Sequence, residues 1–296
     1  MLSDPGGREL GLRALARTED QRESVAPMTS CRFHPNLIRP KNPMPRSRPG
    51  HQIITPSEAR TAIFIDYEAT TKRAPTLLGV RIEKATQVWV LETAFQRCVG
   101  LGGASRTLRG DHSQCVTALV DRATQENRVI ISWSEHDLRL MEPALAGDTD
   151  RLASLHAQYR DAKKSGRRWM ARQSERRRAA VLKNGHKLEV YRTLFNVHQP
   201  EHFGSGVAGN AMRLLRSQLH QGRPFRELSE KARKSWHVLV RHNEFDLTSL
   251  QQVCERIAEG MQVPAAPKSI ASPSRAAAPS RAARAARNSR ERNPTR

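Results

Sequence analysis

Apolar residues gather in short runs over the first half of the chain, in a pattern typical of strands. The runs span residues 61–66, 77–82 and 87–93, and brief polar stretches separate them. They are rich in Ile, Val, Leu, Phe and Trp, residue types that favour strands over helices. Because the connections are short, we expect the three runs to form an antiparallel meander.

The next segments change to the helical period of three to four residues. Residues 111–127 repeat apolar positions at this spacing, and Asp111 or Ser113 can cap the start of the predicted helix. A buried strand is expected over residues 128–132, and a further helix over 135–145. This order of elements predicts an α/β fold with a mixed sheet.

A long helix over about residues 230–259 is expected to end the structured region. Its apolar face consists of Leu239, Leu250, Val253 and Ile257. Gly260 is expected to stop the helix. These patterns predict one domain over residues 59–262, with a basic helical insertion at about 151–190.

Both ends of the chain lack such periodicity. Residues 1–58 are rich in proline, and residues 263–296 consist almost entirely of Ala, Pro, Ser and Arg. Segments of this composition cannot bury enough apolar surface to offset the entropy of ordering, so we expect both to be disordered. The basic tail either attracts polyanions without specificity or has no role.

The charge of the chain favours a nucleic acid as its partner. The 296 residues include 50 Lys and Arg against 29 Asp and Glu, a formal net charge of +21, which repels itself unless a polyanion neutralises it. A basic membrane-surface protein is the rival class, but we find no membrane span, signal peptide or anchoring segment. Four scattered cysteines without a C-x-x-C pair are typical of a reducing, cytoplasmic location.

The first apolar run ends in two acids, Asp66 and Glu68. Residues two apart on a strand share a face, so these side chains are expected to lie about 7 Å apart. Carboxylates this close repel each other unless a divalent cation binds between or beside them. The alternative is an ordinary strand end that meets solvent.

Later segments supply more residues of the same kind. Asp137 follows the fourth predicted strand, close to Glu135, and the long helix carries His242 and Asp246 four residues apart on one face. A solvated helix surface is the alternative for the last two residues.

These stretches resemble the motifs of a known family. "FIDYEATTKRAPTLLGV" is similar to the first motif of the DEDD superfamily of ribonuclease H-like 3′–5′ exonucleases, and most closely of the YprB-type predicted nucleases. "VIISWSEHDLRLM" resembles the second motif, and "RHNEFDLTSLQQV" the third, H-N-x-x-D-x-x-S-L. The resemblance covers about residues 60–259.

The resemblance implies a ribonuclease H-like fold. Its mixed five-stranded sheet would combine a three-strand antiparallel meander with parallel strands, and helices would flank it. It also implies that two Mg²⁺ or Mn²⁺ ions support cleavage of phosphodiester bonds in DNA or RNA. A single strand or a free 3′ end is the expected substrate.

Roles for individual residues follow from the same resemblance. Carried over by position, the metal ligands would be Asp66, Glu68, Asp137 and Asp246. His242 would accept a proton or orient the attacking water. The family places a helper histidine five residues before the last acid and a helper tyrosine four before. His242 has the tyrosine spacing, so both roles stay open.

Basic residues recur at every fourth position of the insertion: Arg160, Lys164, Arg168, Arg172 and Arg176. On one helix they would form a continuous stripe. Like charges at this spacing cost about 0.2–0.5 kcal/mol per pair, so we expect a phosphate backbone as the partner that offsets the repulsion. A solvated basic arm is the alternative. Trp169 within it either stacks on a base or packs.

One motif is rejected. "GSGVAG" at residues 204–209 satisfies G-x-G-x-x-G, but the nearest predicted strand, over residues 188–195, ends well before it. A dinucleotide site requires a strand directly before the first glycine, so we expect no nicotinamide or flavin.

Three hypotheses from different classes remain. A metal-dependent nuclease leads, and a nucleic-acid-binding module on the same fold with little or no catalysis is the alternative. A small-molecule enzyme or a structural protein is the third.

Overall fold

The computed structural model describes residues 53–69, 74–101, 107–200, 203 and 206–262. All of them belong to one of the two units into which the chain divides, Arg46–Arg296. The expected disorder of residues 1–52 and 263–296 lies outside the described residues.

The folded region begins earlier than the sequence predicted. Ile54 is buried, and helix α1 (Pro56–Thr61) starts directly after it. Thr55 and Glu58 form a reciprocal capping box at the start of α1, and Pro56 occupies the first helical turn. Prolines that were attributed to a disordered extension therefore include one that begins a helix.

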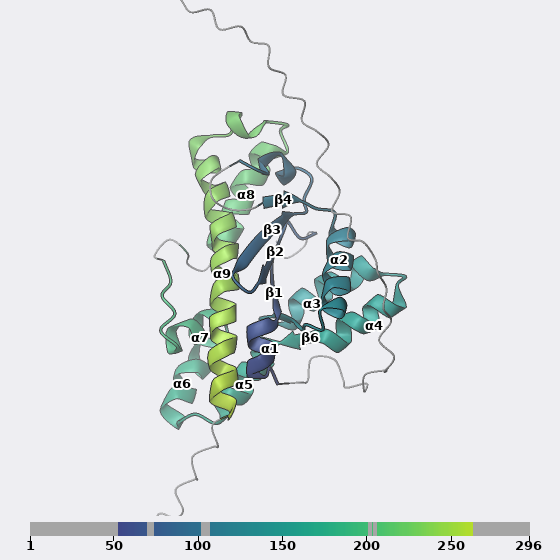
Figure 1. Ribbon diagram of the computed structural model, residues 1–296. Helices are drawn as coiled ribbons and strands as arrows, with labels where there is room; N and C mark the ends of the chain where they lie inside the picture. Colours follow the sequence, from purple (N-terminus) through teal and green to yellow (C-terminus); the bar gives the residue numbers. More distant parts are fainter. Residues whose placement is uncertain (1–52, 70–73, 102–106, 201–202, 204–205, 263–296) are drawn as a thin grey trace, which may run out of the picture. The chain divides into compact units, whose positions relative to one another are not determined.

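A mixed sheet of six strands lies at the centre of the fold, in the order β4-β3-β2-β1-β5-β6 (Figure 1). The strands are β1 (Ile63–Glu68), β2 (Leu77–Ile82), β3 (Ala85–Val90), β4 (Thr107–Arg109), β5 (Ile130–Ser132) and β6 (Tyr159–Asp161). The predicted antiparallel meander of β1, β2 and β3 is confirmed, and β5 pairs in parallel with β1. The expected number of five strands is wrong. Both β4 and β6 were missed, because each has only three residues and, unlike β5, contains no run of apolar side chains.

Helices cover both faces of this sheet. They are α1, α2 (His112–Gln125), α3 (Glu135–Met141), α4 (Thr149–Gln158), α5 (Ala162–Ala171), α6 (Glu175–Asn184), α7 (Leu188–Leu194), α8 (Val207–Leu219) and α9 (Glu230–Gln262). Short 3-10 helices are η1 (Phe95–Cys98), η2 (Glu142–Leu145) and η3 (Phe225–Glu227). No helix in the described part of the chain combines the length and apolar character needed to cross a membrane.

The two faces of β1 meet different helices. Ile63, Ile65 and Tyr67 pack against the layer that contains α2 and α3, and Phe64 packs against α9 on the opposite face (Figure 1). Alternation along the strand therefore directs Asp66 and Glu68 toward α9 as well. This arrangement brings the two acids of the first motif to the helix that carries the third.

Helix α9 runs past the residue that was expected to stop it. It continues through Gly260 to Gln262. A Cβ atom at position 260 would lie 2.4 Å from Nε1 of Trp169, so the glycine makes room for the indole. Trp169 is buried and its ring centroid lies 4.8 Å from that of Phe195, which identifies it as a packing residue.

The insertion is not one helix. Arg160 belongs to β6, α5 starts after the capping residue Asp161, and the chain leaves the helical path between Arg172 and Ser174. Residues 188–194, which were expected to be a strand, form α7. The predicted continuous basic stripe is therefore wrong.

Candidate metal centre

Glu68, His242 and Asp246 converge where the end of β1 meets α9. Each offers one ligand atom, and these three atoms all lie within 4.8 Å of one another. Nδ1 of His242 lies 3.6 Å from Oε1 of Glu68 and 3.3 Å from Oδ2 of Asp246. The structure thus places together three of the residues that the sequence singled out, although position 68 is far from 242 and 246 in the chain.

Asp66 lies beside this group, and Asn243, which follows His242 on α9, holds it in place. Nδ2 of Asn243 donates to Oδ2 of Asp66 at 2.9 Å and to its carbonyl oxygen at 3.1 Å. Burial raises the pKa of Asp66 well above its usual value, and the charges of Asp246, Glu68 and Asp137 raise it further. All four predicted acids therefore lie close enough to influence one another.

Asp137 sits in the first turn of α3, directly past the end of β5. It is buried, and burial raises its pKa to about 7, while the Ser132 hydroxyl and the backbone amides of Tyr67 and Ser134 favour its ionised form. The parallel pairing of β1 with β5 joins only Ile63 to Ile130 and Phe64 to Ile131, so the Tyr67 amide lies beyond the paired residues. Asp137 lies at the edge of the site, outside the group of Glu68, His242 and Asp246.

Arg192 is the site residue that sequence reasoning missed. Its buried guanidinium pairs with Oδ1 of Asp246 at 2.8 Å and lies 5.0 Å from the centroid of the Phe245 ring. Its segment was interpreted as a strand. A helical interpretation would have placed Tyr191 and Arg192 on the buried side of α7, but no local pattern indicates a partner 54 residues away.

The charges of the cluster are interdependent. Burial raises the pKa of Glu68 and of Asp246, and His242 opposes the shift at both, with Arg192 opposing it at Asp246. Burial lowers the pKa of His242, but the adjacent carboxylates of Glu68 and Asp246 outweigh burial, so its pKa is raised. Crowded carboxylates with raised pKa values are the electrostatic setting in which a divalent cation is stabilising.

Buried polar atoms without a hydrogen-bond partner also mark this place. Nδ1 of His242 makes no hydrogen bond of normal geometry to either neighbouring carboxylate, and Nε of Arg192 is likewise unpaired. An unsatisfied buried polar atom costs about 1–3 kcal/mol. A nitrogen in this state between two carboxylate oxygens fits the donor set of a cation such as Mn²⁺.

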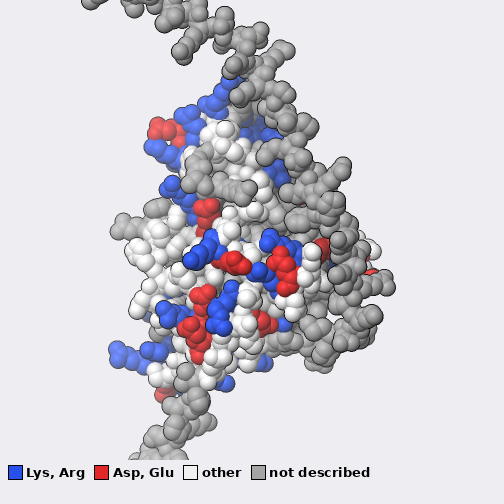
Figure 2. Space-filling view, viewed as in Figure 1, with Lys and Arg blue, Asp and Glu red and all other residues white. Residues whose placement is uncertain are grey.

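The predicted phosphate-binding residues lie in different environments. Arg160 is buried and pairs with Glu58 at 3.0 Å, Lys164 pairs with Glu135, and Arg172 donates to the carbonyl of Met261 at 2.8 Å. Arg168 and Arg176 are exposed. Figure 2 shows Lys and Arg interspersed with Asp and Glu over the middle of the visible face. Arg168 and Arg176 thus remain as exposed candidates for a phosphate contact, and Arg172 is exposed as well but donates to a backbone carbonyl.

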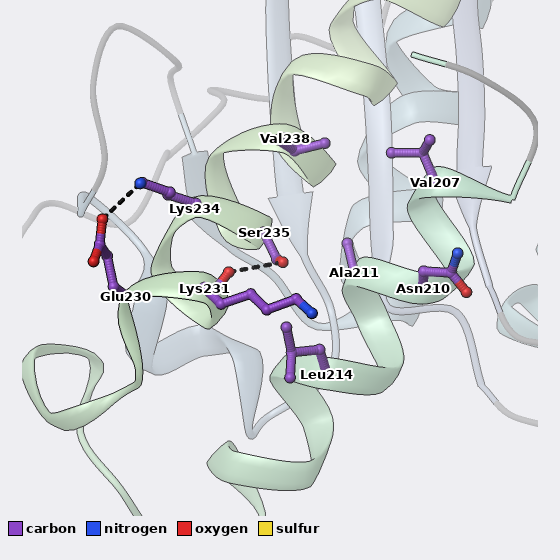
Figure 3. Close-up of a pocket in the computed structure, with 9 residues that line it drawn as sticks. All are labelled: Val207, Asn210, Ala211, Leu214, Glu230, Lys231, Lys234, Ser235 and Val238. Carbon is purple, nitrogen blue, oxygen red and sulfur yellow. Dashed lines mark hydrogen bonds and ion pairs between the residues drawn. The ribbon is translucent and has the colours of Figure 1, made fainter. Parts of the chain in front are cut away.

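A separate groove lies between α8 and the first half of α9 (Figure 3). Its lining consists of Val207, Asn210, Ala211, Leu214, Glu230, Lys231, Lys234, Ser235 and Val238. The groove shares no residue with the carboxylate cluster, and its single carboxylate, Glu230, pairs with Lys234. It offers no chemistry comparable to that of the cluster. Among the described residues, the element before Gly206 and α8 is the helix α7 and not a strand.

Comparison of the chain with protein-family models, with curated proteins and with solved structures finds no match. The function of the site must therefore be inferred from its geometry and from the sequence motifs that meet in it.

Proposed function

We propose that the chain is a divalent-metal-dependent nuclease that hydrolyses phosphodiester bonds of DNA or RNA, with 3′–5′ exonuclease polarity as the motif resemblance implies. The observation that carries the proposal is the convergence of Glu68, His242 and Asp246 from the first strand and the last helix. Asp66 and Asp137 lie next to this group, so the whole predicted acid set occupies one end of the sheet.

The strand order supports a ribonuclease H-like arrangement for this proposal. Strands β3, β2, β1, β5 and β6 are neighbours in that order, with the antiparallel meander on one side of β1 and parallel strands on the other. This is the five-stranded arrangement that the motifs imply, and β4 extends it by one strand at the edge.

The residues would divide the work as follows. Asp66, Glu68 and Asp246 would hold Mg²⁺ or Mn²⁺, two ions if the resemblance extends to their number, and Asp137 would act at the edge of the site. Bound divalent ions would lower the pKa of a water and offset the charge that develops on the phosphate. His242 would accept the proton of that water or orient it. Arg192 keeps Asp246 in place, and Arg168 and Arg176 would meet backbone phosphates.

A binding module without catalysis is the second candidate, and one observation favours it. Arg192 already neutralises Asp246, and His242 lies between Asp246 and Glu68, so the protein itself partly balances the charges. Such a module would bind strands and leave them intact.

Cleavage of end-labelled single-stranded DNA and RNA with Mg²⁺ or Mn²⁺ separates the two candidates. We expect cleavage by the wild type and its loss in Asp66→Asn, because the variant removes one anionic ligand. Asp121→Asn is the matched control: Asp121 pairs with Arg151 on the exposed surface of α2, and this variant should cleave normally. Strand binding without cleavage by the wild type would contradict the nuclease and support the module.

A further inference from the structure

Asn243 makes the most specific side-chain contact within the site. Its side chain is fully buried on α9, and one amide nitrogen donates to two acceptors of the same residue, Oδ2 and the carbonyl oxygen of Asp66. One side chain thus fixes both the carboxylate and the backbone of the first acidic residue. Asn243 directly follows His242 in the third motif, and none of the functions considered above uses it.

The orientation of the Asn243 amide is dictated by chemistry. If the amide were reversed, its oxygen would face two acceptor oxygens of Asp66, and no hydrogen bond would form. The nitrogen must therefore face Asp66. The amide oxygen, which is buried without a partner, points to the other side, toward strand β2.

Gly79 of β2 receives that oxygen. Gly79 is the residue of β2 that lies opposite Asp66 in the antiparallel register. A Cβ atom at position 79 would lie 1.9 Å from Oδ1 of Asn243 and 2.7 Å from Cδ1 of Leu247. A larger residue at position 79 would displace the amide, because its Cβ atom would overlap the side chains of Asn243 and Leu247.

We propose that Asn243 is a positioning residue for the metal centre: it sets the orientation of Asp66, and Gly79 provides the space that this requires. The proposal rests on the proposed metal-dependent function and assigns roles to two motif residues that are not among the proposed metal ligands. Groups that hold a ligand in place are often as important as the ligand itself, and their loss typically weakens metal binding by about 10–100-fold.

The test measures Mn²⁺ affinity by electron paramagnetic resonance of the free ion, together with kcat, KM and the melting temperature of the full chain. In Asn243→Ala we expect Mn²⁺ to bind at least about tenfold more weakly, and kcat to fall with little change in KM. Leu250→Ala is the control. Leu250 is buried on the same helix in the apolar cluster that contains Phe64, so we expect its truncation to lower the melting temperature and to leave Mn²⁺ affinity unchanged.

The double variant Gly79→Ala/Asn243→Ala separates positioning from packing. Gly79→Ala alone should lower both the melting temperature and Mn²⁺ affinity, because the new methyl group displaces the amide. In the double variant the methyl group fills the space that the amide leaves, so the melting temperature should recover while Mn²⁺ affinity stays low.

Two results would overturn the proposal by itself: wild-type Mn²⁺ affinity in Asn243→Ala, or its return in the double variant together with the melting temperature. If the wild type neither binds Mn²⁺ nor cleaves, the metal-dependent function fails, and the positioning role fails with it.

Discussion

Arg192 shows how a single residue can decide the electrostatics of the site. Four carboxylates share a small volume, and this permanently charged guanidinium pairs with one of them, Asp246, beside His242. The hydroxyl of Ser249, in the "S-L" end of the third motif, lies 3.5 Å from the same nitrogen of Arg192. Arg192 therefore favours the ionised form of Asp246 before any cation binds, although burial still raises the pKa of this carboxyl.

Loss of Arg192 should destabilise the fold strongly. In Arg192→Ala, Asp246 would remain buried without its partner, a situation that typically costs about 3–5 kcal/mol. Urea unfolding of the metal-free protein measures the change. Arg151→Ala removes an exposed ion pair with Asp121 and should cost no more than about 1 kcal/mol. If the two variants lost equal amounts of free energy of unfolding, the ion pair of Arg192 with Asp246 would be no more stabilising than an exposed one.

At the scale of elements, long periodic segments and the apolar run that forms β5 were predictable, whereas the two short strands at the sheet edges were not. Strands β1 to β3 and helices α2 and α9 were all identified from their periods, and the acids of the site lie on or next to such elements. Strands β4 and β6 have three residues each, and their pairing depends on neighbours that are distant in sequence. The helix α7 was taken for a strand because Val190, Tyr191 and Phe195 favour strands locally, whereas packing against α9 favours a helix.

The same limit applies to the candidate site. Asp66, Glu68, His242 and Asp246 could be found because each stands at a position with a recognisable period or motif. Arg192, Asn243 and Gly79 act through contacts across the fold, and nothing in their own neighbourhoods specifies those contacts. The prediction of a basic stripe was wrong because the regular spacing of its residues assumed one helix. The chain instead changes from β6 to α5 within that spacing.

Glycine lowers the stability of a helix unless close packing requires it. Gly260 in α9 and Gly209 in α8 test whether such packing is present. Gly260→Ala should destabilise the protein, because the new Cβ would lie 2.4 Å from the Trp169 indole nitrogen. Gly209→Ala in α8 is the matched change: a Cβ at position 209 meets nothing within 4 Å, so the variant should gain roughly 0.5–1 kcal/mol in the free energy of unfolding. Thermal or urea unfolding measures both. A stabilised Gly260→Ala would contradict the packing role.

At the scale of the whole molecule, one buried ion pair joins the sheet to the α8 helix. Nε and Nη2 of Arg216 donate to the two carboxylate oxygens of Glu92, at 2.9 and 2.6 Å. Thr76, at the start of β2, donates to the same carboxylate at 2.9 Å. The pair thus holds α8 to the end of the meander, next to the apolar cluster that contains Trp236.

The pH dependence of stability should reveal this connection. Burial raises the pKa of Glu92, but the hydrogen bonds from Arg216 and Thr76 outweigh it, so the pKa lies below the ordinary value of 4.5. Because the folded pKa is lowered, the stabilisation is complete above the unfolded pKa and is lost as the pH falls through the folded pKa. Glu92→Gln should therefore lower the free energy of unfolding at pH 7 by about 1.5–3 kcal/mol, the range for hydrogen bonds to a charged group.

Urea unfolding of the wild type and Glu92→Gln between pH 7 and pH 3 makes the comparison. The difference between the two proteins should stay constant down to about pH 5 and shrink below it, as Glu92 of the wild type gains a proton. Glu83→Gln, which removes an exposed partner of Arg128, should show a small difference at every pH. If the difference in the free energy of unfolding between the wild type and Glu92→Gln stayed unchanged at pH 3, the charge of Glu92 would not be what holds α8 to the sheet.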